Sequence, residues 1–311
     1  ASSKDETGSA RSTPARPAED HTMRALTIAR FTIHEAISRR LILAGIILSL
    51  AYLALFAIGF ALLYGILLEE AASSSSPSDD SQIVPVFGSM LTLLGLYAVN
   101  FLSNFLALFL SVGAVSGEID SGTLHAVLAR PIRRWEFVLG RWLGYAGLMA
   151  GYVALMSTGL LLLARLIAGY ETPEPGRAIA LMALGALLLM TISLLGSTIL
   201  STLANGVVVF SLFGLAWLAG IIEVLGSALQ NQAMIAIGIV VSLIVPSDAI
   251  WRGASYFIQS PALLSLAAAA DAPTTPFAAT TPPAPALVVW AVGYVLVCLL
   301  AAAATFARRD L

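Results

Sequence analysis

Long uninterrupted apolar runs constrain this chain more than any other feature. The first extends from Leu41 to Leu68 without a charged residue, and a helix of about 20 apolar residues crosses a bilayer. A soluble domain carries about 25% charged residues, whereas this 311-residue chain carries 11% and is 59% hydrophobic. In lipid, backbone polar groups must be satisfied internally, as they are in a helix. The runs therefore predict an all-α polytopic membrane protein.

We expect six transmembrane helices. They cover residues 41–68, 84–116, 142–164, 178–203, 207–226 and 286–306, with Ala204, Asn205 and Gly206 forming a tight turn between the fourth and fifth. The apolar run at residues 233–245 stops at Pro246 and is too short to cross a bilayer. It predicts a re-entrant or extracytoplasmic helical element between the fifth and sixth spans, followed by a helical pair of Asp248 with Arg252.

The N-terminal part divides into two segments. Residues 1–21 are rich in Ser, Pro, Ala and charge, which predicts a disordered tail. Residues 22–40 show an apolar helical stripe beside polar residues, a pattern typical of an interfacial helix. An extension of the first span fits this pattern equally well. Residues 22–311 then form a single transmembrane domain.

The basic residues indicate an orientation. With both termini in the cytoplasm, all of the 16 Lys and Arg residues except Arg165, Arg177 and Arg252 lie on the inside. Cytoplasmic loops carry such an excess of basic residues. A seventh span at residues 233–245 would move Arg308 and Arg309 outside, so six spans and a re-entrant element are preferred.

Several kinds of chemistry are excluded by missing residues. The chain has no G-x-x-x-x-G-K-[ST] motif to bind ATP and no H-E-x-x-H zinc motif. Its three histidines, His21, His34 and His125, all lie outside the spans, so no intramembrane serine protease is expected. Cys298 is the one cysteine, which rules out a disulfide within the chain. A net charge of −2 gives no reason to expect nucleic acid as a partner.

Three polar residues within the spans are possible pathway residues. Asn100 and Asn104 lie one turn apart on one face of the second span, where they either line a substrate path or form interhelical hydrogen bonds. Glu223 lies near the outer end of the fifth span and either relays protons or sits at the interface. No basic partner for Glu223 is evident within the spans.

One long polar segment, residues 115–141, interrupts the apolar sequence. Asp120 or Ser121 can cap a helix over residues 123–129, which Pro131 ends. The segment is then either a rigid helix across the inner mouth of two spans or an ordinary basic loop. After it, Gly140, Gly144, Gly147 and Gly151 recur along one side of the third span, which predicts a surface where another helix can approach closely.

This segment resembles the ABC-2 type permeases, the membrane subunits of ABC transporters. The resemblance rests on Gly117-Glu118-x-x-Ser121-Gly122-Thr123-Leu124, on Arg130-Pro131-Ile132-x-Arg134-x-Glu136 and on Gly140-Arg141-x-x-Gly144. Ile28-Ala-Arg-x-Thr32-x-x-Glu35-Ala and Phe306-x-Arg308-Arg309-Asp310-Leu311 also look typical. The branch that looks most similar includes the permease of nitrous-oxide-reductase maturation. The common family form has a base where Asp120 or Ser121 stands and often Lys where Arg141 stands.

The resemblance implies a non-enzymatic permease subunit of an exporter in a prokaryotic inner membrane. It would work as a homodimer with two copies of a separate ATPase, which binds the ATP and Mg, and an extracytoplasmic accessory protein is a further expected partner. The segment between the second and third spans would be the cytoplasmic coupling helix. Its contact residues would be Glu118, Asp120, Ser121, Gly122, Thr123, Leu124, Arg130, Pro131 and Arg134.

Two other functions fit the residues alone. A stand-alone carrier or channel would use Glu223, Asn100 and Asn104, and a membrane scaffold would anchor a partner complex without transport. Dependence on an ATPase distinguishes the permease from both.

Overall fold

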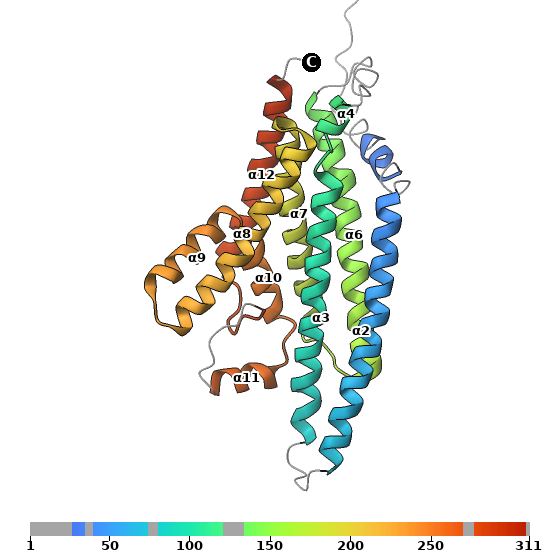
Figure 1. Ribbon diagram of the computed structural model, residues 1–311, viewed down its shortest axis with the longest axis vertical. Helices are drawn as coiled ribbons and strands as arrows, with labels where there is room; N and C mark the ends of the chain where they lie inside the picture. Colours follow the sequence, from blue (N-terminus) through green and yellow to red (C-terminus); the bar gives the residue numbers. More distant parts are fainter. Residues whose placement is uncertain (1–26, 35–39, 74–79, 121–133, 270–276, 309–311) are drawn as a thin grey trace, which may run out of the picture.

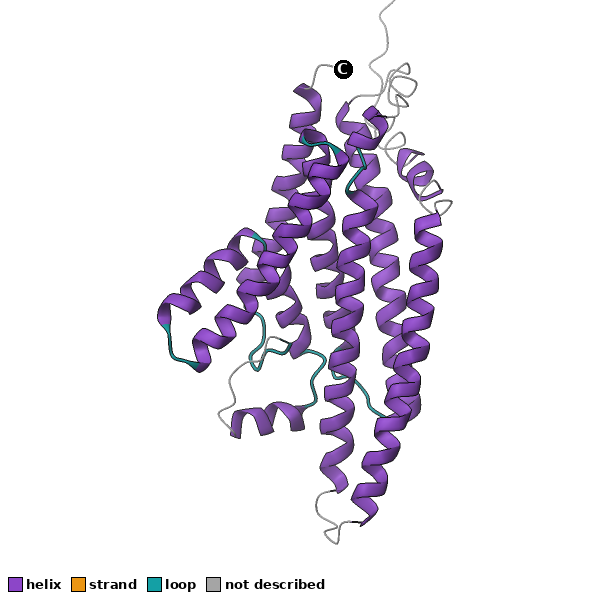
Figure 2. Cartoon of the chain, viewed as in Figure 1, coloured by secondary structure: helices purple, strands orange, loops and turns teal. Residues whose placement is uncertain are grey.

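The computed structural model describes residues 27–34, 40–73, 80–120, 134–269 and 277–308. Within them, helices joined by loops make up almost the whole structure (Figure 2). Six of these helices are long and apolar enough to span a membrane: α2 (Arg40–Ser73), α3 (Asp80–Ser111), α6 (Arg134–Ala168), α7 (Pro175–Ile199), α8 (Thr202–Ala228) and α12 (Pro285–Arg308). The prediction of an all-α polytopic membrane protein is confirmed.

Helix α7 forms the centre of the bundle. It contacts α3, α6, α8, α10 and α12, and Leu188, Leu189 and Met190 are fully buried on successive positions. A helix that is apolar all round is suited to such a central place. The outer helices instead expose large apolar side chains, among them Leu155, Leu166 and Val289. In a membrane these side chains lie against lipid, where apolar exposure costs nothing.

Parts of three helices lie at one end of the bundle. The start of α2, the short helix α4 (Ser116–Asp120) and the end of α12 lie together at the top of Figure 1. We call this the α4 end. The end of α2 and the start of α3 lie at the opposite end.

Between α8 and α12 the chain forms three shorter helices. Helices α9 (Gln232–Ile244) and α10 (Ser247–Tyr256) are bent by 101° at Val245 and Pro246. Helix α9 packs as a hairpin against α8, and α11 (Pro261–Ala269) follows. The expected short helical element between the fifth and sixth spans is present, as is the ion pair of Asp248 with Arg252, whose Oδ2 and Nε atoms are 3.1 Å apart.

The close approach of α8 and α9 depends on glycine. A Cβ added at Gly226 would lie 2.7 Å from the Cβ of Met234, and one at Gly238 would overlap the Glu223 side chain. Almost all other α9 residues are partly or fully exposed, and only Gly238 is buried.

One predicted boundary is wrong. The turn between the fourth and fifth spans lies at Leu200 and Ser201, where the Ser201 hydroxyl accepts a bond from the backbone N–H of Ala204 at 3.5 Å. Asn205, predicted in the turn, lies inside α8. The second span, predicted at residues 84–116, agrees with the spanning segment Val86–Glu118. Within it α3 ends at Ser111, and a turn at residues 112–115 leads into α4.

The expected interfacial helix at residues 22–40 is described in part. Residues 27–34 are helical, while the rest of that helix up to residue 39, together with the tail at residues 1–21, lies outside the described residues.

Candidate functional site

The motifs that carry the family resemblance converge on the first turns of α6. Glu118 of α4 forms an ion pair with Arg141 of α6. The Arg141 side chain is only 4% exposed, and its Nη1 atom also donates a hydrogen bond to the Tyr145 hydroxyl at 3.0 Å. Its guanidinium lies 5.6 Å from the centre of the Phe137 ring. Burying a charge is costly unless it is paired, so this pairing fixes α4 against α6.

The α4 segment is also hydrogen-bonded to α8. The hydroxyls of Ser116 and Thr202 share a hydrogen bond at 2.8 Å. One turn further along α8, the Asn205 amide nitrogen donates to the carbonyl oxygens of Val112 and Ser193, each at 2.8 Å. Gly113 permits this approach, because a Cβ there would lie 3.2 Å from the Thr202 side chain. The residues just before the central polar segment therefore connect α6, α7 and α8.

The N-terminal helix at residues 27–34 rests on the same part of α6. A Cβ added at Gly144 would lie 2.8 Å from Thr32 Cβ and 2.9 Å from the Ala29 carbonyl oxygen. Both Ala29 and Thr32 are buried. Of the predicted glycine strip, Gly144 makes such a close helix contact, whereas Gly147 and Gly151 have open space beside them.

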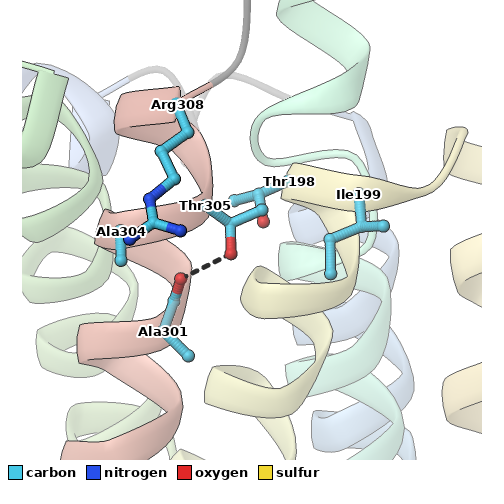
Figure 3. A pocket seen from close by; sticks show the side chains of 6 residues that line it. All are labelled: Thr198, Ile199, Ala301, Ala304, Thr305 and Arg308. Atoms are coloured by element: carbon cyan, nitrogen blue, oxygen red, sulfur yellow. Dashed lines mark hydrogen bonds between the residues drawn. The ribbon is translucent and has the colours of Figure 1, made fainter.

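The C-terminal end of α12 completes the cluster. Phe306 is fully buried, with its ring 5.7 Å from that of Phe137. Arg134 at the start of α6 donates from Nη1 to the Ala307 carbonyl at 3.3 Å. Beside these contacts, a groove of about 580 Å³ opens between α7 and α12. Figure 3 shows Thr198 and Ile199 on one side of it and Ala301, Ala304, Thr305 and Arg308 on the other.

The structure places only some of the predicted coupling residues. Glu118 and Asp120 lie in α4, and Arg134 begins α6. Ser121, Gly122, Thr123, Leu124, Arg130 and Pro131 lie outside the described residues. Sequence reasoning missed the pairing of Glu118 with Arg141, although both stand in the quoted motifs. The available signal was their opposite charge beside apolar spans.

The polar residues within the spans form a second group. Arg252 Nη2 donates to Glu223 Oε2 at 2.7 Å, so Glu223 has a basic partner from outside the six spanning helices. The partner comes from α10, far along the chain, which the pattern of the spans does not reveal. Asn100 and Asn104 are both buried in α3 and line a small cavity with Asp248 of α10.

Among the described residues, no three or more His, Cys, Asp or Glu side chains gather as they would around a metal ion. Cys298 is a buried free thiol in α12. The ion pairs and close helix contacts instead suit an element that transmits movement between helices.

Comparison with known sequences agrees with the motifs. No curated protein matches the chain. The sequence profile of the ABC-2 family transporter proteins matches residues 34–311, which contain all six spanning helices and the contacts of Glu118 and Arg141 described above. The chain therefore belongs to the ABC-2 transporter family and is a membrane-spanning permease component of an ABC transporter.

Proposed function

We propose that this permease is the membrane subunit of an exporter driven by a separate ATPase. Two copies of the chain would pair with two ATPase subunits, which bind the ATP and Mg. The chain lacks a P-loop of its own, and this supports a separate source of energy. The excess of basic residues on one side of the predicted spans supports placing the α4 end in the cytoplasm, and the family supports a prokaryotic inner membrane.

The ion pair between Glu118 and Arg141 carries the proposal. It joins the segment before the central polar loop to a 35-residue spanning helix. The hydrogen bond between Ser116 and Thr202 joins the same segment to α8. A push on the α4 end would therefore move α6 and α8 together. Because packed interfaces switch between discrete arrangements rather than deforming smoothly, such a push can change which side of the membrane the pathway faces.

The ATPase would contact the central polar segment around Asp120 to Arg134. Glu118 would not touch the ATPase directly but would hold this segment in place through Arg141. The groove beside Arg308 in Figure 3 lies at the same end of α12 and would add to this docking surface. Substrate would pass outward between the two permease copies, and an accessory protein would dock on the extracytoplasmic end.

To test the proposal, the complex is isolated from native membranes. The experiment measures the coupling of ATP to movement of the permease, so it requires no chosen substrate. Cys298→Ser removes the one native cysteine, and Glu171→Cys places a thiol in the exposed loop between α6 and α7. ATP with vanadate is expected to change the labelling rate of this thiol when a P-loop ATPase copurifies. Adding Glu118→Ala should abolish the change while ATP hydrolysis continues.

Glu174→Ala serves as the matched control, because Glu174 forms an exposed ion pair with Arg177 at 2.7 Å, remote from α4. It should leave the ATP response intact. A purified chain that transports fully without any ATPase would overturn the proposal, as would a complex in which Glu118→Ala responds to ATP like the unmodified protein.

A further inference from the structure

A small cavity lies between α3, α8 and α10, with Ser247 and Asp248 of α10 in its lining just after the bend that joins α9 to α10. Its volume is about 20 Å³, and about 10–15 Å³ of such volume accommodates one water-sized particle. Asn104 of α3 and Ser247 and Asp248 of α10 line it together with Trp217 of α8 and Trp251.

Three oxygen atoms in this cavity lack a hydrogen bond. They are Asn104 Oδ1, Ser247 Oγ and Asp248 Oδ2, and none has a partner among the described residues. Asn104 is 2% exposed and Ser247 is 4% exposed, so bulk water does not satisfy them. Arg252 Nε lies 3.1 Å from Asp248 Oδ2 as an ion pair, without the direction of a hydrogen bond. Buried acceptors without a partner are costly, which points to a bound species in the cavity.

The charges around the cavity are unbalanced. Arg252 pairs with both Glu223 and Asp248, so one positive charge faces two negative charges. Their side chains are 14%, 24% and 10% exposed, respectively. Gly220 leaves the room that the Asp248 carboxylate occupies, because a Cβ at Gly220 would overlap that carboxylate. A buried excess of one negative charge is unfavourable unless a cation accompanies it or a carboxyl takes up a proton, and burial raises the pKa of the Asp248 carboxyl above its usual value.

The local backbone is also of the kind that holds ions. Discontinuous helices in membrane transporters present backbone carbonyls at their broken ends, and these coordinate small cations. Here α9 ends at Ile244 and α10 begins at Ser247, with a 101° bend between them. Irregular backbone at membrane depth is tolerated where it is buried in protein or lines a cavity, and Val245 and Ser247 are both buried.

We propose that this cavity binds one alkali cation, Na⁺ or K⁺, through the oxygens of Asn104, Ser247 and Asp248. A single positive charge balances the excess, and oxygen ligands suit a hard cation. A divalent ion would need more carboxylates than the described residues bring together. Water would satisfy the acceptors but would leave the charge uncompensated. Because Asn104 belongs to α3 and Asp248 to α10, the cation would fasten the bent element to the bundle.

The test uses the purified full chain in nanodiscs. Trp217 and Trp251 line the cavity, so tryptophan fluorescence reports on it during titration with NaCl or KCl, with choline chloride keeping ionic strength constant. A saturable change is expected with at least one alkali cation and none with choline. Ser247→Ala should raise the cation concentration at half-saturation by about tenfold, a loss of affinity typical when a group that supports a bound metal ion is removed.

Ser242→Ala is the matched control, because Ser242 lies on α9 and its hydroxyl bonds to its own helix at 2.9 Å. It should titrate like the unmodified chain. Asn104→Ala provides a second variant from a different helix and should also weaken binding. Three outcomes would overturn the proposal: an equal fluorescence response to choline, a response that follows pH alone, or a titration that neither cavity variant changes. A bound water or a protonated carboxyl would then take the place of the cation. None of these outcomes depends on an ATPase, so they are separate from the test of the proposed function.

Discussion

At the scale of single residues, charge and burial decide where the ionisable side chains lie. Glu118, which we expect to be a coupling residue for the ATPase, forms an ion pair with Arg141 of its own chain. The reason is that Arg141 is 3% exposed, and a buried guanidinium needs an acceptor. The sequence shows two opposite charges but not the turn at residues 112–115 that brings them together.

Glu118→Ala should therefore destabilise the chain as well as uncouple it. Removing one partner of a buried ion pair costs about 3–5 kcal/mol, and the partial exposure of Glu118, at 16% of its side chain, places the expected loss toward the lower end. The midpoint of thermal unfolding in detergent measures this. Glu171→Ala is the control, because its pair with Arg165 is 65–66% exposed and should contribute about 0–1 kcal/mol. Equal effects of the two substitutions would show that Arg141 does not depend on Glu118.

Asn205 shows why a turn motif misled the prediction. Ala-Asn-Gly is typical of turns because Asn and Gly tolerate left-handed backbone. Within the bundle, however, the Asn205 side chain donates to the carbonyl of Val112 in the turn after α3 and to that of Ser193 in α7, and a helical backbone holds it there. Tertiary hydrogen bonds, which a local motif does not contain, outweighed the local preference.

Asn205→Ala should consequently loosen the junction of α3, α7 and α8. It leaves two buried carbonyl oxygens without a side-chain donor, which costs about 1–3 kcal/mol. Asn205→Asp keeps the size but removes the donor, so both variants should lower the thermal midpoint. Ser265→Ala, on the exposed face of α11, is expected to change it little. Unchanged stability in Asn205→Asp would show that the donated bonds contribute nothing.

At the scale of the elements, hydrophobic patterning predicted the six spanning helices to within a few residues at most ends. Helix α12, for example, runs from Pro285 to Arg308 against a predicted 286–306. Helix α6 begins at Arg134, eight residues before the apolar run that starts at residue 142, because its first turns are polar and carry the motif contacts. Hydrophobicity cannot reveal a helix that continues out of the membrane, whereas helix capping and packing can.

Glycine contacts between elements lead to a prediction with a close control. Gly144→Ala adds a Cβ within 3 Å of Thr32 and the Ala29 carbonyl, so the N-terminal helix must move away from α6. Overpacking of this kind typically costs about 1–3 kcal/mol. Gly147→Ala, three residues further on, meets open space and should be neutral or stabilising, since Ala favours a helix over Gly by about 1 kcal/mol.

Limited proteolysis near residues 27–34 measures the docking of that helix directly. Faster cleavage in Gly144→Ala than in Gly147→Ala is the expected result. Equal cleavage in both variants would contradict the contact of Thr32 with Gly144.

At the scale of the whole molecule, an even number of spans lets the first spanning helix begin and the last one end on the same side of the bundle. The start of α2 and the end of α12 lie at the α4 end in Figure 1. The bent pair of α9 and α10 fits the expected re-entrant element, because α9 has only 13 residues and α10 turns away by 101°, and it would make a seventh span only if both helices were counted as one. The positive-inside pattern predicted this arrangement, and the α4 end carries Arg134 and Arg308. What the pattern could not predict is which helices pack around α7, since that depends on side-chain shape.

The orientation itself is tested by labelling intact cells with a maleimide that does not cross membranes. In the Cys298→Ser background, Glu171→Cys between α6 and α7 should react from outside, because it lies at the end opposite α4. Arg308→Cys at the end of α12 should react only after the membrane is permeabilised. Both sites are exposed, so lack of reaction reports sidedness rather than burial. If Arg308→Cys reacted in intact cells while the helix at residues 27–34 stayed protected from labelling, the two ends of the bundle would lie on opposite sides of the membrane. The bent element would then cross the membrane completely, and the coupling surface would lose the part that α12 contributes.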